Sequence, residues 1–89
     1  SLAIVDPSRK VRAVGETLRD LRLRKGLSQE RLAVLVGVDR GYLASLDRGE
    51  HLARRATIER LLPHLGVTFA EFSQAVQTRT PARVHPGGR

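Results

Sequence analysis

Apolar residues recur at three- and four-residue steps along most of the chain, the spacing at which side chains share one face of a helix. The first such run lies within residues 7–25 and the last within residues 68–76. Three more lie between them, at about residues 28–36, 39–48 and 57–65. No alternating run of the kind that forms a strand is present. The pattern therefore predicts five helices and an all-α fold.

Capping residues mark the expected ends of the first three helices. Asp6-Pro7-Ser8 is typical of a helix start and Lys25-Gly26 of a helix end. Ser28 and Asp39 are expected to cap the second and third helices. The apolar faces are expected to form the core, from Val11, Val14, Leu18 and Leu21, then Leu32, Leu35 and Val36, then Leu43 and Leu46. About three residues around Gly37 separate the second and third helices, so the two must cross steeply, as in a helix-turn-helix.

The fourth helix is expected to begin at Thr57. Pro63 predicts that this helix is short or kinked, because proline lacks the backbone N–H and its ring pushes on the preceding turn. Thr68 and Glu71 match the capping box of a fifth helix. From Gln77 onward, two prolines, two glycines and no periodicity predict disorder. The chain is thus expected to divide into an N-terminal arm (1–6), a helix-turn-helix domain (7–76) and a disordered basic tail (77–89).

The formal net charge is +7, and the excess of basic residues is unevenly spread. Residues 1–76 hold 13 Lys or Arg against nine Asp or Glu, and the last 13 residues add three arginines and no acid. A basic balance favours polyanionic partners, with nucleic acid first and an anionic membrane second. A soluble domain that is simply rich in arginine would carry the same charge. No apolar run approaches the ~18 residues of a membrane span, and the lack of cysteine fits a reducing compartment.

Catalytic chemistry has little support in the sequence. His51, His64 and His85 are scattered, and Ser28 and Ser45 fit a helix cap and a groove residue better than nucleophiles. No phosphate loop, His-Glu-x-x-His pair or paired-carboxylate arrangement is present. We expect no enzymatic activity, no cofactor and no metal site.

Beyond this periodicity, the chain carries short motifs in a fixed order. They are Leu21-Arg22, Lys25-Gly26-Leu27-Ser28-Gln29-Glu30, Leu32-Ala33, Gly37-Val38, Leu46-Asp47-Arg48-Gly49, Ile58, Leu61 and Leu65-Gly66-Val67. Each motif alone says little, but the ordered set over roughly residues 12–73 resembles the Xre family of phage-repressor-like helix-turn-helix domains. The resemblance implies a five-helix domain that binds DNA.

One stretch resembles a particular branch of this family. Asp39-Arg40-Gly41-Tyr42-Leu43 resembles the start of the recognition helix in restriction–modification controller proteins, which are small stand-alone dimers. Stand-alone antitoxins and phage-type regulators use the same scaffold, and both remain alternatives. The chain departs from many relatives at Gly41, where they carry a longer polar residue, and at Pro63 in the fourth helix.

The resemblance implies that the third helix, about residues 39–48, lies in the major groove of DNA. Arg40 is then the leading base reader, because its guanidinium can donate twice to guanine O6 and N7. Tyr42 and Ser45 are further candidates for base contact, and Tyr42 also fits an aromatic at the edge of the core. Gly41 would let the backbone approach the groove closely.

The resemblance also implies contacts with the DNA backbone. Gln29, next to the cap Ser28, matches a glutamine with which the family binds phosphate, and a helix N-terminus suits an anion. Arg48, Arg54 and Arg55 lie at or after the end of the third helix, where the family contacts phosphate. Such contacts set register rather than sequence choice. Solvated surface arginines would give the same pattern.

Two further features concern stability and assembly. The resemblance implies an internal salt bridge between Arg22 and Asp47, on the first and third helices. Relatives usually form dimers that place two recognition helices about one DNA turn apart, ~34 Å. We expect Phe72 in the core and a dimer interface near the fifth helix, formed by Phe69, Leu65 and Val76, with the apolar residues 2–5 as a second strip. The alternative is that both phenylalanines belong to the core.

The sequence therefore predicts a transcriptional regulator that binds an inverted-repeat operator in double-stranded DNA as a homodimer. Such a protein would be cytoplasmic and associated with the nucleoid. The alternative is an antitoxin-type or other interaction module whose main partner is a protein, such as a toxin or RNA polymerase.

Overall fold

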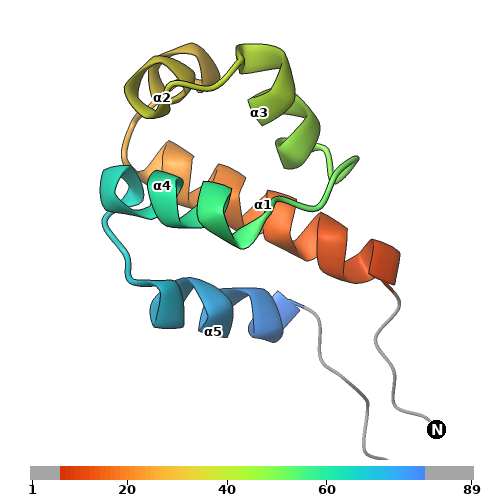
Figure 1. Ribbon diagram of the computed structural model, residues 1–89. Helices are drawn as coiled ribbons and strands as arrows, with labels where there is room; N and C mark the ends of the chain where they lie inside the picture. The colour runs from red at the N-terminus through yellow and green to blue at the C-terminus, as the bar shows by residue number, and fades with distance from the viewer. Residues whose placement is uncertain (1–6, 80–89) are drawn as a thin grey trace, which may run out of the picture.

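A computed structural model describes residues 7–79 as five helices with no strand among them (Figure 1). The helices are α1 (Pro7–Arg24), α2 (Gln29–Val36), α3 (Arg40–Asp47), α4 (Arg55–Leu65) and α5 (Phe69–Arg79). The long α1 packs against α3 on one side and α5 on the other, and α4 contacts α2 and α5. The predicted all-α, five-helix fold is confirmed. The expected arm, the cap Asp6 and most of the expected tail lie outside the described residues.

Side-chain caps form where the sequence predicts them. The Ser28 hydroxyl accepts a hydrogen bond from the backbone N–H of Arg31 at 3.0 Å, and the Asp39 carboxylate accepts one from Tyr42 N–H at 3.2 Å. At the start of α5, the Thr68 and Glu71 side chains each accept from the other residue's backbone N–H, as in a capping box. These caps satisfy donors that a helix start leaves unpaired.

The fourth and fifth helices are longer than expected. Helix α4 begins at Arg55 rather than Thr57, and it continues through Pro63 to Leu65. Proline removes only one backbone bond near the end of α4, and the burial of Leu65 beyond it favours the last turn. Helix α5 continues past the expected boundary at residue 76 to Arg79, whose guanidinium pairs with two acidic side chains of α1, Asp20 and Glu16.

The core is built from the inner faces of all five helices. Leu18, Leu32, Leu43, Leu46 and Leu61 are its most deeply buried large apolar side chains. The expectation for α2 is wrong at one position. Leu35 is 41% exposed, and Ala33 is buried in its place. Side chains at positions 32, 33 and 36 share the face of α2 that meets α3 and α4, and residue 35 lies beyond the edge of that face.

Helices α1 and α3 approach so closely at Gly15 that no side chain fits there. A Cβ at this position would overlap the carbonyl oxygen of Leu46 and lie 3.1 Å from that of Asp47. Both obstacles are backbone atoms, so relief requires one helix to move. The glycine thus sets how closely the end of α3 sits on α1.

We predict that Gly15→Ala lowers the free energy of unfolding by about 1–3 kcal/mol, the usual cost of overpacking, despite the better helix propensity of alanine. Urea unfolding followed by circular dichroism measures it. Gly41→Ala is the matched control, because Gly41 is exposed and a Cβ there meets only the Asp39 carboxylate. Its gain in helix propensity and its loss of cap geometry are each about 1 kcal/mol and nearly cancel. Equal stability of Gly15→Ala and the wild type would contradict the close approach.

Candidate nucleic-acid interface

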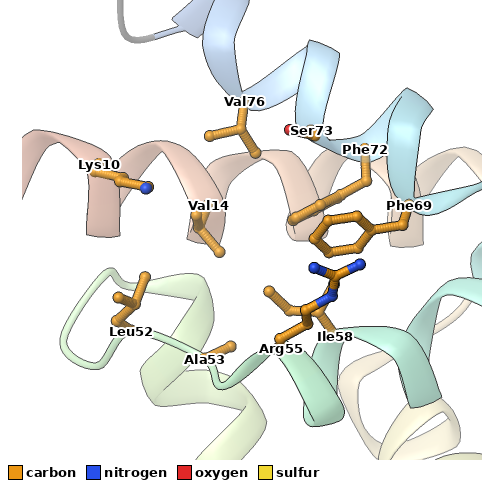
Figure 2. Close-up of a pocket in the computed structure, with 10 residues that line it drawn as sticks. All are labelled: Lys10, Val14, Leu52, Ala53, Arg55, Ile58, Phe69, Phe72, Ser73 and Val76. Carbon is orange, nitrogen blue, oxygen red and sulfur yellow. The ribbon is translucent and has the colours of Figure 1, made fainter.

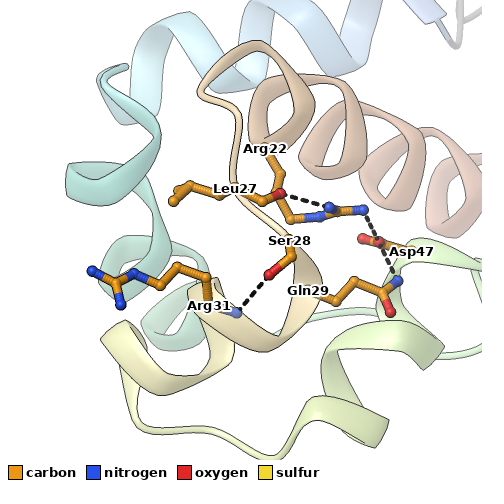
Figure 3. Close-up of polar contacts among 6 residues, drawn as sticks. All are labelled: Arg22, Leu27, Ser28, Gln29, Arg31 and Asp47. Atoms are coloured by element: carbon orange, nitrogen blue, oxygen red, sulfur yellow. Dashed lines mark hydrogen bonds and ion pairs between the residues drawn. The ribbon is translucent and has the colours of Figure 1, made fainter.

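A buried polar cluster joins the three helices of the helix-turn-helix region (Figure 3). Arg22 Nη2 of α1 lies 3.1 Å from Asp47 Oδ2 at the end of α3, which is the predicted salt bridge, and its Nη1 donates to the Leu27 carbonyl at 2.8 Å. The Arg22 and Asp47 side chains are only 8% and 5% exposed. Gln29 Nε2, from the first residue of α2, donates to the same Asp47 oxygen at 2.9 Å. One carboxylate therefore ties α1, α2 and α3 together.

This cluster changes the interpretation of Gln29. The sequence predicts a phosphate contact for it, and the structure shows one of its amide hydrogens used by Asp47. An amide nitrogen has two hydrogens, so the second is still available to an acceptor. The carboxylate thus fixes the direction of the amide at the N-terminus of α2, next to the exposed cap Ser28.

The first turn of α3 is the most open part of the predicted base-reading surface. Arg40 and Gly41 are exposed, and Arg40 forms no ion pair with any described residue. Leu43 and Leu46, each 1% exposed, hold the opposite face of α3 in the core. Tyr42 is half-buried and packs against the core edge. The helix is therefore anchored on one side and presents a free guanidinium on the other.

The expected base contact by Ser45 is wrong. Ser45 is only 7% exposed, and its hydroxyl donates to the Tyr42 carbonyl at 2.6 Å. A serine inside a helix commonly bonds a carbonyl of the preceding turn in this way. The hydroxyl is therefore used within α3 and faces the protein rather than solvent.

The arginines expected to contact phosphate differ in their surroundings. Arg48 donates to both carboxylate oxygens of Glu50, at 2.7 and 3.1 Å, and both side chains are more than half exposed. This hydrogen-bonded pairing raises the pKa of Arg48 and lowers the pKa of Glu50. Arg55 pairs with Glu59 at 3.0 Å. Arg54 is exposed and forms no ion pair within the described part of the chain.

The predicted dimer residues are only partly accessible. Leu65 and Val76 are only 2% and 7% exposed, because both side chains pack in the core of the same chain. The prediction that they face a partner is therefore wrong. Phe72 is buried, as predicted. Phe69 is half-buried, with the Arg55 guanidinium 4.2 Å from its ring centroid.

Phe69 borders an open apolar pocket of about 210 Å³ between α1, α4 and α5 (Figure 2). Leu52, in the loop between α3 and α4, stands at its rim and is 53% exposed. Sequence reasoning missed Leu52 because helical periodicity gives no signal in a loop. Together Leu52 and Phe69 form an apolar surface, the pocket rim.

Residues 7–79 contain neither a cluster of metal-binding side chains nor a helix suited to crossing a membrane. No group of three or more His, Asp or Glu residues there is close enough to hold a metal ion. None of the helices in this part of the chain is both long and apolar enough to cross a membrane.

Comparison with known proteins agrees with this geometry. A family described as "Helix-turn-helix domain" matches residues 13–75. The HTH-type transcriptional regulator SutR of Escherichia coli (strain K12) is 33% identical over 75 residues, which are 84% of this chain and 42% of SutR. The chain thus spans less than half the length of that relative. The control protein C.MunI of a Mycoplasma species is 31% identical over 64 residues, 71% of this chain and 86% of its own.

Among solved structures, the restriction-modification controller protein C.AhdI from Aeromonas hydrophila superposes with a TM-score of 0.66. It is 39% identical and covers 70% of this chain and 94% of its own. The resemblance drawn from the motifs is therefore confirmed. The relatives compared are regulators and controller proteins, not enzymes.

We predict that Asp47→Ala lowers the free energy of unfolding by about 3–5 kcal/mol, because it leaves the buried Arg22 guanidinium without its counter-charge. Thermal and urea unfolding measure the loss. Glu59→Ala is the control, since it removes one partner of an exposed ion pair and is expected to cost no more than about 1 kcal/mol. If the two variants were equally stable, the buried pair would have no special role.

Proposed function

Since the chain belongs to the helix-turn-helix family, we propose that it is a transcriptional regulator that binds double-stranded DNA sequence-specifically, with α3 in the major groove. The observation that carries the proposal is the open first turn of α3. Arg40 is exposed there and has no ion-pair partner among residues 7–79, while Leu43 and Leu46 anchor the helix in the core. A rigidly held helix with a free guanidinium at its N-terminal end has the geometry that reads guanine in the major groove.

Backbone contacts would fix the position of α3 on the duplex. The N-terminus of α2 offers free N–H groups, the Ser28 hydroxyl and the second amide hydrogen of Gln29 to a phosphate oxygen. Arg54, in the loop after α3, has no ion-pair partner in the described part of the chain and supplies a cation for the same DNA backbone. These groups account for affinity and register, and Arg40, with Tyr42 beside it, accounts for sequence choice.

A single copy makes few base contacts, so we propose that the protein acts as a homodimer on an inverted repeat. The pocket rim, Leu52 and Phe69, supports this arrangement as an apolar surface beside α1, α4 and α5 that burial would stabilise. Binding to an operator would place the protein with the nucleoid in the cytoplasm.

We predict that selection from a random duplex pool enriches an inverted repeat, and that Arg40→Ala relaxes one position in each half-site. The loss of a bidentate pair amounts to about 1–3 kcal/mol of discrimination at that position. Sequencing of the bound molecules gives both results. Ser45→Ala is the control, because its hydroxyl is already bonded within α3, and it should leave the selected sequence unchanged. Binding that ignores sequence and depends only on salt would contradict the proposal.

We predict that Leu52→Ser weakens self-association by roughly 10- to 100-fold, the equivalent of ~1.5–3 kcal/mol, because each of the two copies loses one half-exposed leucine from a symmetric interface. Sedimentation equilibrium over a concentration series measures the change. The control is Val34→Ser on α2, which is 76% exposed and does not line the pocket. If the wild type is monomeric well above micromolar concentration, or if both variants behave alike, the pocket rim is not the dimer contact.

A further inference from the structure

The turn that follows α3 holds an arginine and a glutamate in a fixed relation. Gly49 has a φ of +73°, a left-handed conformation that glycine adopts readily. The backbone N–H of Gly49 donates to the Leu46 carbonyl, and that of Glu50 donates to the Ser45 carbonyl, both at 3.0 Å. A Cβ at Gly49 would lie 3.0 Å from Arg12 Cα, so the turn is also held against α1. The backbone that carries Arg48 and Glu50 is therefore ordered by its own bonds.

Within this turn, the Glu50 carboxylate occupies the hydrogen-bonding fork of Arg48. Arg48 Nε and Nη2 meet the two carboxylate oxygens at 2.7 and 3.1 Å. A phosphate group offers a similar pair of anionic oxygens to a guanidinium. Phosphate and the Glu50 carboxylate therefore compete for the same two N–H donors of Arg48. Since both side chains are exposed, this competition takes place at the protein surface.

We infer that Glu50 acts as an internal substitute for phosphate, which holds Arg48 in its DNA-free arrangement and limits the attachment of the protein to arbitrary duplex DNA. The inference rests on the proposed DNA-binding function and adds a residue that sets its non-specific affinity. Phosphate must displace the carboxylate before Arg48 contributes a counter-charge. The displaced carboxylate is then left close to the negatively charged DNA backbone.

The other paired arginine of this region is arranged differently. Arg55 lies against the Phe69 ring as well as Glu59, and its partner is on the same face of α4 one turn away. Arg55 lines the apolar pocket, whereas Arg48 is the C-cap of α3 itself. Of these two paired arginines, Arg48 is therefore the one attached directly to the helix proposed to enter the major groove.

The test is the affinity of Glu50→Gln for one arbitrary duplex, measured by fluorescence anisotropy at several salt concentrations. We expect tighter binding than wild type by on the order of threefold to tenfold, and a plot of log affinity against log salt steeper by about 0.9, which is one additional phosphate neutralised. Glu30→Gln is the charge-matched control on the same helix-turn-helix region, because Glu30 has no ion-pair partner among the described residues. It should leave the salt slope unchanged.

The double variant Arg48→Ala/Glu50→Gln separates release of Arg48 from simple removal of a negative charge. In the Arg48→Ala background, Glu50→Gln should tighten binding no more than Glu30→Gln does. Carboxyl titration by NMR gives an independent readout without DNA. The pKa of Glu50 should lie below the ordinary value for a glutamate and should rise in Arg48→Ala.

Two results would overturn the inference. One is a gain from Glu50→Gln that persists in full without Arg48, and the other is a gain no larger than that from Glu30→Gln. Either can occur while selection still yields an inverted repeat, and the proposed function then stands without this addition. Conversely, the expected salt slopes together with a failed selection would leave the role of Glu50 intact and remove sequence-specific regulation. A wild-type protein that binds no duplex at any salt concentration contradicts both.

Discussion

The buried ion pair between Arg22 and Asp47 is the constraint on which the rest of the arrangement depends. A chain of 89 residues without cysteine has only a small core to fix the directions of five helices. Asp47 is the last residue of α3, and its carboxylate accepts hydrogen bonds from Arg22 of α1 and from Gln29 at the start of α2. Because a buried charge is strongly destabilising without its partner, alternative crossings of α2 and α3 that separate these groups are disfavoured. A buried ion pair adds little net stability over apolar packing, so we assign it a role in specifying the helix angle.

That angle matters because the groups proposed to meet DNA lie on both helices. Gln29 is fixed at the N-terminus of α2 by the same carboxylate that ends α3. The open turn with Arg40 lies at the other end of α3, and Gly15 lets the carboxyl end of α3 sit directly on α1. Core packing, one glycine and one carboxylate therefore hold the proposed phosphate-binding group and the proposed base-reading group in a single rigid frame, as preorganised recognition requires.

Features encoded locally could be predicted from the sequence, whereas those that depend on neighbouring elements could not. The caps Ser28, Asp39 and Thr68 follow from residues a few positions apart, and all three form. The direction in which a side chain points is harder to predict. A helical wheel places Ser45 opposite Leu43 only approximately, and its hydroxyl in fact bonds within α3. Leu65 is apolar whether it faces a partner or the core, so its sequence cannot decide between them. The motifs indicated the Arg22–Asp47 pair, but the bond from Gln29 spans 18 positions and leaves no local signal.

The central claim is that one rigid face, formed by the N-terminus of α2, the first turn of α3 and the loop that follows α3, meets DNA. The most direct measurement is amide chemical-shift mapping of the labelled protein during titration with a duplex. The account predicts that the large changes fall on Gln29, Arg40 to Tyr42 and the loop around Arg54, while the α5 amides on the far side of α1 change little. The largest changes on α5, including Phe69, with α3 and the loop around Arg54 unaffected, would contradict it.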